Sequence, residues 1–278
     1  MTTRPSLPES YTVPAVWQVP TDPSGQPFGG MNRPTAGKRS ERDLPVGKHP
    51  LQLYSLGTPN GQKVTILLEE LGVDYDAWKI NIMQLDQFTS GFVAINPNSK
   101  IPALVDNTGE KPIRVFETGS ILLHLAEKYG KFIPTDPALR AECLNWLFWN
   151  VGTAPFLGGG FGHFYKYAPV SIEYGIDRFT METKRILDVL DQQLSQNKYV
   201  SGQEYTIADM AIFPWIRCLD TGYNAKEFLQ LDSYANVKRW SALLLERDAV
   251  KRGLRVNGFG PDAVENRHEK SDFEKAAL

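Results

Sequence analysis

Hydrophobic positions between residues 51 and 130 follow two periods, which predicts strands joined to helices. Short apolar runs of strand length occur at 51–56, 75–82, 101–105 and 113–116. Apolar residues also recur with the i, i+3, i+4, i+7 spacing of a helix at 64–71 and 122–129. A glycine follows each helical stripe, as is typical of a helix end. The order predicts a small mixed α/β domain.

The first strand-to-helix turn, residues 57–61, is dense in residues that break regular structure and cap helices. At a helix start, free backbone N–H groups and the positive end of the dipole can hold an anion, including a thiolate. From this segment alone, an ordinary capped helix is the better interpretation. Its chemical importance depends on the rest of the chain.

Strand patterns end near residue 137, and helical patterns continue. Helical stripes occur at 144–151, 169–195 and 237–244. Thr206 and Asp209 have the spacing of a capping box, which predicts a further helix from residue 207. The glycine-rich segment 158–162 predicts a loop that allows close backbone packing. The second half of the chain is therefore expected to be an all-helical domain.

Four segments follow from these patterns. They are an extended N-terminal arm (1–49), the α/β domain (50–133), the helical domain (137–254) and a polar tail (255–278). The arm is rich in Pro, Gly, Ser and Thr, but it carries more apolar groups than disordered segments usually do: Tyr11, Val16, Trp17, Phe28 and Met31. We therefore expect the arm to pack on the domain and the tail to wrap the surface.

Composition limits the classes of function. The 278 residues are 42% hydrophobic, and the formal net charge is −2. That balance predicts a globular core and gives no electrostatic attraction for nucleic acid or a membrane surface. No basic and apolar leader is visible, and no apolar run reaches the roughly 18–20 residues that span a bilayer. A cytoplasmic protein is expected.

Cysteine and histidine usage gives no sign of a metal or a protein redox centre. Cys143 and Cys218 are far apart and form no C-x-x-C motif, so they are interpreted as buried apolar thiols. The histidines show no ligand spacing: His49, His124, His163 and His268. No metal site is predicted.

The chain resembles the cytosolic glutathione transferases over roughly residues 51–252. The resemblance rests on the strand entry at Ile101 and Pro102, the helix start at Glu117 and Thr118, and the T-I-A-D capping box. Longer strings are similar to the nu-class, disulfide-reductase branch of that superfamily: YSLGTPNGQKVTI, NPNSKIPALVD, NWLFW and APFLGGGFGHFY. The resemblance implies a thioredoxin-like N-terminal domain, an all-helical C-terminal domain, glutathione bound between them, and a homodimer.

In that family, one group of residues contacts the middle of glutathione. The resemblance implies that Thr58, Pro59 and Asn60 lie beside its sulfur. It also implies that the main chain of Ile101 bonds the cysteinyl backbone, as a neighbouring strand would. Thr58 and Asn60 are the residues we expect to be catalytic, because the Thr58 hydroxyl, the backbone N–H groups around Asn60 and the helix dipole are the candidate donors to the thiolate.

The two ends of glutathione are assigned in the same way. Glu117 and Thr118 are implied to hold the γ-glutamyl ammonium and carboxylate, and Gln87 to contact the glycyl end. Relatives commonly carry serine where Thr118 stands, which keeps the hydroxyl group. These assignments are implications of the resemblance alone.

The resemblance also implies a second bound glutathione. Asn32, in an Asn-Arg-Pro motif on the arm, and Arg178 on the long helix would hold it. Arg178 suits a carboxylate because guanidinium donors form a fork. Relatives commonly have glutamine near Val151, and valine has no polar side-chain atom for that contact. Asn150 next to it is a candidate replacement, although neighbours on a helix point about 100° apart.

The expected activity is glutathione-dependent disulfide reduction without an enzyme redox cysteine. A free thiol has a pKa of roughly 8.5, so donors that lower it raise the thiolate fraction. The thiolate would attack a disulfide, and a second glutathione would resolve the mixed disulfide. Two alternatives stay open. One is conjugation to electrophiles or hydroperoxide reduction, expected in any case as weak side activities; the other is a non-enzymatic glutathione-binding regulator.

Overall fold

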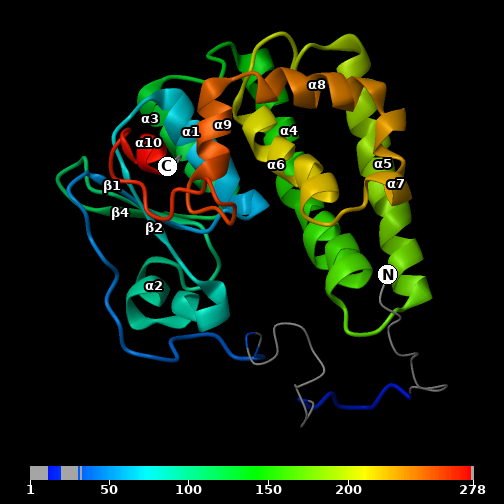
Figure 1. Ribbon diagram of the computed structural model, residues 1–278, viewed down its shortest axis with the longest axis horizontal. Coiled ribbons are helices and arrows are strands. Elements are labelled where there is room, and N and C mark those ends of the chain that lie inside the picture. The colour runs from blue at the N-terminus through cyan, green and yellow to red at the C-terminus, as the bar shows by residue number, and fades with distance from the viewer. Residues whose placement is uncertain (1–11, 20–30, 32, 277–278) are drawn as a thin grey trace.

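The computed structural model describes residues 12–19, 31 and 33–276, and it places them in an α/β domain followed by a helical domain (Figure 1). The strands are β1 (Leu51–Ser55), β2 (Asp76–Lys79), β3 (Ala103–Asp106) and β4 (Ile113–Phe116). The helices of the first domain are α1 (Pro59–Leu71), η2 (Ile82–Gln84), η3 (Asp86–Phe88), α2 (Ser90–Ile95) and α3 (Thr118–Tyr129). Later helical segments are α4 (Pro137–Pro155), η4 (Phe156–Tyr167), α5 (Glu173–Gln196), α6 (Ile207–Thr221), α7 (Lys226–Leu229), η5 (Leu231–Ser233), α8 (Ala235–Leu245), α9 (Asp248–Arg255) and α10 (Asp272–Lys275).

The sheet has the strand order β2-β1-β3-β4. β1 runs parallel to β2 and antiparallel to β3, with Leu53 opposite Leu104, and β3 pairs antiparallel with β4. All five residues of β1 are buried, as expected for a central strand with helices on both faces. This β-α-β-β-β-α arrangement, with the short α2 before β3, is the predicted thioredoxin-like fold.

Helix α1 begins and ends at the residues that its capping signals predict. Thr58 is its N-cap, and the Thr58 hydroxyl accepts a hydrogen bond from the Gly61 N–H. Pro59 occupies the first helical position, where no N–H is needed. Gly72 ends the helix in the left-handed conformation, with φ of 70°. The anion-binding end of the helix is therefore fixed directly after β1.

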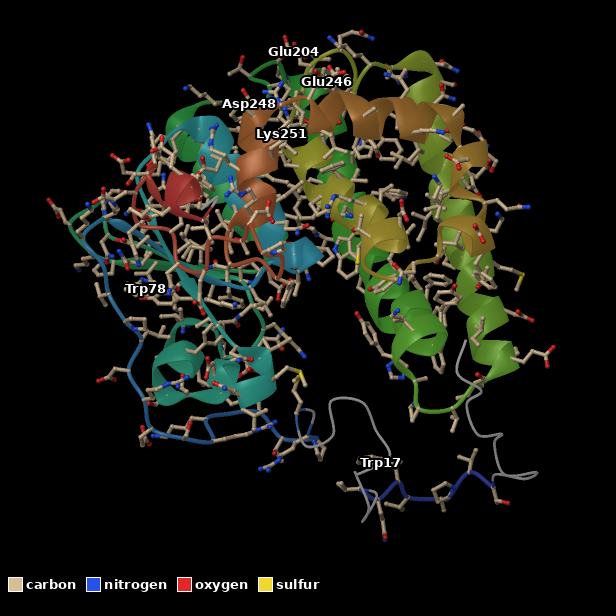
Figure 2. All side chains as sticks on the ribbon, viewed as in Figure 1. Trp17, Trp78, Glu204, Glu246, Asp248 and Lys251 are labelled. Carbon is tan, nitrogen blue, oxygen red and sulfur yellow. The ribbon has the colours of Figure 1, made fainter. Side chains whose placement is uncertain are left out.

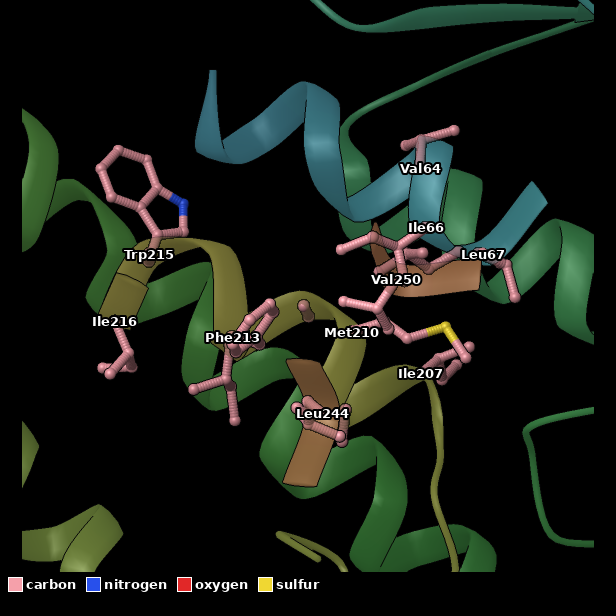
Figure 3. Close-up of a cluster of buried hydrophobic side chains, with 14 of the residues drawn as sticks. Val64, Ile66, Leu67, Ile207, Met210, Phe213, Trp215, Ile216, Leu244 and Val250 are labelled. Carbon is pink, nitrogen blue, oxygen red and sulfur yellow. The ribbon is translucent and has the colours of Figure 1, made fainter. Parts of the chain in front are cut away.

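Helices cover both faces of the sheet and join the two domains (Figure 1). On one face, α2 packs through Phe92 on a small cluster with Tyr54 and Ala103. On the other face, α1 lies against α3, α6 and α9. Figure 3 shows the resulting core, in which Ile66 of α1 meets Val250 of α9. One hydrophobic core therefore runs through both domains and holds their mutual orientation.

In the helical domain, the predicted capping box of α6 is confirmed. The Thr206 side chain caps the helix, and the Asp209 carboxylate accepts from the Thr206 N–H at 3.0 Å. Asp209 also accepts from the Trp240 indole at 2.8 Å, so the cap ties α6 to α8. None of the described helices has the length and apolar character needed to cross a membrane.

The predicted loop at 158–162 is wrong, because α4 continues directly into η4, a stretch wound as a π-helix. The glycines allow aromatic rings to lie against the helix backbone. A Cβ atom on Gly158, Gly160 or Gly162 would come within 2.5 Å of Trp215, Phe179 and Tyr223 respectively. The close backbone packing expected of these glycines is present, and it occurs within a helix.

The described part of the N-terminal arm includes residues that pack on the α/β domain and residues that do not. The Arg39 N–H donates to the Phe88 carbonyl at 2.8 Å, and Ser40 pairs with Thr89. Val16 and Trp17 were expected to pack as well, but they are 75% and 61% exposed, and Trp17 lies away from both domains in Figure 2. Tyr11 and Phe28 lie outside the described residues.

The C-terminal tail does more than wrap the surface as predicted. The Arg267 main chain pairs with Ala77 in both directions, which covers the exposed edge of β2. The Arg267 side chain is buried over the Tyr75 ring and bonds the Tyr75 carbonyl. The polar composition of the tail did not predict this role. An arginine side chain is buried favourably only where it stacks on a ring and forms hydrogen bonds, and those partners are distant in sequence.

Candidate functional site

A cavity of about 500 Å³ lies between the two domains, in front of the start of α1. Seven of the nine residues predicted to bind glutathione line it: Thr58, Pro59, Asn60, Gln87, Ile101, Glu117 and Thr118. Met31 of the arm and, from the helical domain, Val151, Ala154, Pro155, Gly158, Gly159 and Trp215 complete the wall on the other side. The cavity therefore has a polar face from the α/β domain and a mostly apolar face opposite.

Asn60 is held in one orientation by the helical domain. The Trp215 indole N–H donates to Asn60 Oδ1 at 3.0 Å. Because an indole nitrogen only donates, the amide oxygen of Asn60 must face Trp215, and its NH₂ group is left for the cavity. Trp215 was not predicted as a site residue, because its place in an apolar stretch of helix indicated core packing only.

Thr58 is close to Asn60 in the sequence, and its hydroxyl group forms only long hydrogen bonds. Thr58 Oγ1 accepts from the Gly61 N–H at 3.4 Å and donates to the Leu56 carbonyl at 3.5 Å. Both distances are at the long limit of a hydrogen bond, so an anion in front of α1 can compete for the hydroxyl proton. Thr58 and Asn60 thus provide two neighbouring donors at the positive end of a helix dipole.

Ile101 offers main-chain groups to the cavity. It precedes a cis peptide bond to Pro102 and lies two residues before β3 begins. The last residue of β3 that pairs with β1 is Ala103, which lies opposite Tyr54. Ile101 therefore lines the cavity from outside the hydrogen-bonded part of the sheet.

Glu117 and Gln87 lie farther along the polar face. Glu117, the N-cap of α3, has φ of 67°, an unfavourable backbone conformation for a side chain larger than glycine. Glu117 lines the cavity, and Asn98 Nδ2 donates to its carboxylate at 3.5 Å. Gln87 is buried, and among the described residues its Oε1 has no hydrogen-bond partner. A ligand donor would satisfy it.

Lys63 is a site residue that the sequence analysis missed. It lines the cavity from α1, yet it is only 1% exposed. Its ammonium donates to Asn150 Oδ1 at 2.7 Å and to Thr118 Oγ1 at 3.4 Å. Burial lowers the pKa of Lys63 to about 7, although the Glu117 carboxylate acts in the opposite direction. No sequence signal distinguishes Lys63 from a solvated lysine, because the helix that carries it becomes buried on nearly all sides only through tertiary packing.

Of the described residues expected around a second glutathione, Arg178 and Asn150 do not line this cavity and Val151 does. Arg178 lies on α5 beside a shallow surface pocket with Tyr174 and Met181, and it approaches Glu182 no closer than 4.0 Å. Asn32 lies outside the described residues. Val151 does line the cavity. Asn150 was a candidate replacement for the missing glutamine, but its side chain is buried against Lys63 and does not line the cavity.

Neither cysteine lines the cavity. Cys143 is buried and Cys218 half-buried, and burial raises the pKa of both thiols, to about 11 for Cys218. Both are therefore protonated at neutral pH and poorly nucleophilic. Within the described residues, no group of three or more His, Cys, Asp or Glu side chains could hold a metal ion.

Comparison with known proteins agrees with this geometry. The family model for the glutathione S-transferase N-terminal domain matches residues 49–127, and the model for the C-terminal domain matches residues 177–248. The chain therefore belongs to the glutathione S-transferase family. Within that family, the chain is 60% identical over 276 residues to the disulfide-bond oxidoreductase YghU of Escherichia coli K12, covering 95% of this chain and 96% of the relative.

Two solved structures extend the comparison. A glutathione transferase YghU from Streptococcus pneumoniae, complexed with glutathione, superposes with a TM-score of 0.87 at 54% identity, covering 90% of this chain and 99% of the other. A family member from Pseudomonas fluorescens with two glutathione bound gives a TM-score of 0.72 at 42% identity, covering 75% and 94%.

Proposed function

We propose that this protein is a glutathione-dependent disulfide reductase in which bound glutathione supplies the attacking sulfur. One observation supports this most directly: the donors at the start of α1 face the cavity, while both cysteines lie elsewhere with raised pKa values. The S. pneumoniae relative, solved with glutathione, supports the identity of the ligand. The name of the E. coli relative supports the reaction class.

The reaction balances as two thiol–disulfide exchanges. The thiolate of the first glutathione attacks one sulfur of the substrate disulfide and forms a mixed disulfide, and the other substrate sulfur leaves as a thiolate that is then protonated. A second glutathione thiolate attacks the glutathione sulfur of the mixed disulfide. The second substrate thiol leaves, and oxidised glutathione is the product. Two glutathione molecules are oxidised for each disulfide reduced.

Thr58 and Asn60 have the central role in this scheme. Two hydrogen bonds and the dipole of α1 stabilise the thiolate more than the thiol, which lowers the thiol pKa. Each hydrogen bond to a charged partner contributes about 1.5–3 kcal/mol, and each 1.36 kcal/mol corresponds to one pKa unit. Two such donors are sufficient to move a thiol of pKa roughly 8.5 below neutrality.

The other cavity residues orient the tripeptide. The main chain of Ile101 pairs with the cysteinyl unit, Glu117 accepts from the γ-glutamyl ammonium, and Thr118 lies at the N-terminus of α3 for the carboxylate. Gln87, whose buried Oε1 has no partner among the described residues, accepts from the amide N–H of the glycyl unit. A second glutathione binds beside the first, and Arg178 of α5 and Asn32, which lies outside the described residues, are the residues proposed to hold it. The Pseudomonas relative with two glutathione bound supports that stoichiometry.

The apolar wall favours two additional activities. Val151, Ala154, Pro155 and Trp215 line the side facing the sulfur site and suit an apolar electrophile or organic hydroperoxide. The same thiolate attacks either compound, so weak transferase and peroxidase activities accompany disulfide reduction. Substrate assays with glutathione compare the three reactions directly.

The test of the proposed function is turnover with a small disulfide. The protein is mixed with glutathione and the disulfide of 2-mercaptoethanol, and oxidised glutathione is followed through glutathione reductase and NADPH. The proposal expects turnover well above the uncatalysed exchange, and above the rates with an aryl halide or an organic hydroperoxide. Glutathione binding without turnover of any of the three would instead support a regulatory protein.

A further inference from the structure

A buried charge lies directly under the polar face of the cavity. Lys63 of α1 meets Thr118 at the start of α3 and Asn150 of α4, with hydrogen bonds of 3.4 Å and 2.7 Å. Burying an ammonium is strongly unfavourable unless partners compensate it. Among the described residues, these two neutral acceptors engage two of its three N–H donors, and neither supplies a negative charge. The side chain therefore fits a site that an anion completes.

Glu117 gives that site its selectivity. Its carboxylate lines the same cavity, next in the chain to the Thr118 that Lys63 contacts. A carboxylate and an ammonium side by side are complementary to a zwitterionic α-amino acid head group, whose ammonium and carboxylate are attached to one carbon. Glutathione carries that pair only at its γ-glutamyl end, because the glycyl end has a carboxylate alone. The geometry thus also fixes the direction in which the tripeptide lies.

We propose that Lys63 is the counter-charge for the α-carboxylate of the γ-glutamyl unit, and that it takes up a proton when that carboxylate binds. The proposal rests on the proposed function for the identity of the ligand. Asn150 holds the ammonium from the helical domain, so the binding site for this carboxylate depends on both domains.

The proton uptake follows from the groups that face Lys63. In the empty site, burial lowers the pKa of Lys63 to about 7 against the opposing field of Glu117. Asn150 and Thr118 are neutral. Glu117 is the charged group that acts on Lys63. Arg252 of α9 pairs with Glu69, and Asp209 of α6 bonds its own cap.

A bound carboxylate raises the pKa of an adjacent ammonium. Above pH 7 the empty site is mostly neutral at Lys63, so binding must draw a proton from solvent. Below about pH 6 the ammonium is already present, and no proton is taken up. The affinity for the carboxylate is therefore highest at or below pH 6 and falls as the pH rises through 7.

The first measurement uses the unaltered protein. S-methylglutathione is titrated calorimetrically at pH 8 and pH 6, in buffers that differ in ionisation enthalpy. Its sulfur carries no proton, so thiol ionisation does not contribute. We expect uptake of roughly 0.5–0.9 proton per bound ligand at pH 8 and close to none at pH 6. Equal proton exchange at the two pH values would overturn the proposal.

The second measurement pairs a variant with a ligand analogue. In the analogue, the γ-glutamyl α-carboxylate of S-methylglutathione is a carboxamide. Lys63→Met is expected to weaken S-methylglutathione binding about 10–100-fold, the range for a charged hydrogen bond, and to change analogue binding little. Lys63→Arg should restore binding without the pH dependence, because arginine stays protonated. Lys251→Met, which removes an exposed lysine of α9, is the matched control and should bind as the unaltered protein does.

The outcomes separate this proposal from the proposed function. If Lys63→Met weakens the binding of S-methylglutathione and of the carboxamide analogue equally, Lys63 only supports the structure of the site. That result would overturn the proposal. If that variant does not fold, the proton measurement on the unaltered protein decides. Proton-linked binding without disulfide turnover would overturn the proposed function alone. Absence of S-methylglutathione binding would overturn both.

Discussion

Trp215 donates its indole N–H to the Asn60 side-chain oxygen across 3.0 Å, and this bond joins the helical domain to the start of α1. The residue proposed to bind the thiolate is therefore oriented by the other domain. The amide NH₂ of Asn60 is left as the cavity donor because its oxygen is already engaged. Thiol activation and domain packing are coupled at this point.

Trp215→Phe tests that coupling. Phenylalanine keeps most of the packing and removes the donor, so the Asn60 amide is free to rotate. The lost hydrogen bond is worth about 0.5–1.5 kcal/mol, which corresponds to a fall of about 2–13-fold in kcat/KM for disulfide reduction. The pKa of bound glutathione, followed by thiolate absorbance against pH, should rise. An unchanged thiol pKa would show that the indole does not orient Asn60.

Thr58 has two functions that separate in its variants. Thr58→Ala removes both the helix cap and the thiolate donor, so it should lower Tm by the equivalent of about 1 kcal/mol and reduce turnover about tenfold or more. Thr58→Ser keeps the hydroxyl and should restore most of both. Melting curves and kinetics on the two variants check this. An alanine variant with full turnover would exclude the hydroxyl as a donor.

The absence of a side chain at Gly158 leaves room for the Trp215 ring. A Cβ atom there would lie 2.5 Å from the indole ring, so Gly158→Ala must displace the ring and disturb its bond to Asn60. Turnover should fall at least as far as in Trp215→Phe, and Tm should fall with it. The matched control is Gly152→Ala on α4, where no atom lies within 4 Å of the added carbon. Equal effects of the two substitutions would contradict the packing argument.

The pH dependence of stability should reflect Asp106 at the end of β3. Lys128 and His124 donate to its buried carboxylate at 2.7 and 2.8 Å. Although desolvation acts to raise the pKa of Asp106, hydrogen bonds from Lys128, Thr108 and His124 outweigh it and hold the pKa well below the usual value. A lowered pKa in the folded state stabilises the protein above the unfolded-state pKa of about 4, and this stabilisation is lost as the pH falls further. Asp106→Asn should therefore lower Tm at pH 7, and the difference should shrink below pH 4.

Local signals in the sequence predicted the parts of the fold that depend on neighbouring residues. The start of α1 and its end at Gly72 follow from Thr58, Pro59 and a C-terminal glycine, each of which acts within one helical turn. The same is true of the cap formed by Thr206 and Asp209. The fold class followed because hydrophobic periodicity reports directly on which faces are buried.

Features that depend on distant partners were not predictable. Lys63 in a helix is typical of a solvated face, and only the approach of Asn150 from α4 reveals that it is buried. The glycines from 158 to 162 predicted a loop, because the rings that pack against them belong to α5, α6 and the segment after α6. Arg267 in the polar tail becomes buried through Tyr75 and Glu69, almost two hundred residues earlier.

The central claim is that the reacting sulfur belongs to glutathione and not to the protein. The most direct measurement is disulfide reduction by the cysteine-free variant that combines Cys143→Ala and Cys218→Ala, assayed with glutathione and the disulfide of 2-mercaptoethanol. Both thiols are buried or half-buried away from the cavity, so the account predicts kcat/KM within about twofold of the unaltered protein once folding is verified by thermal melting. Loss of turnover in a folded cysteine-free protein would contradict it.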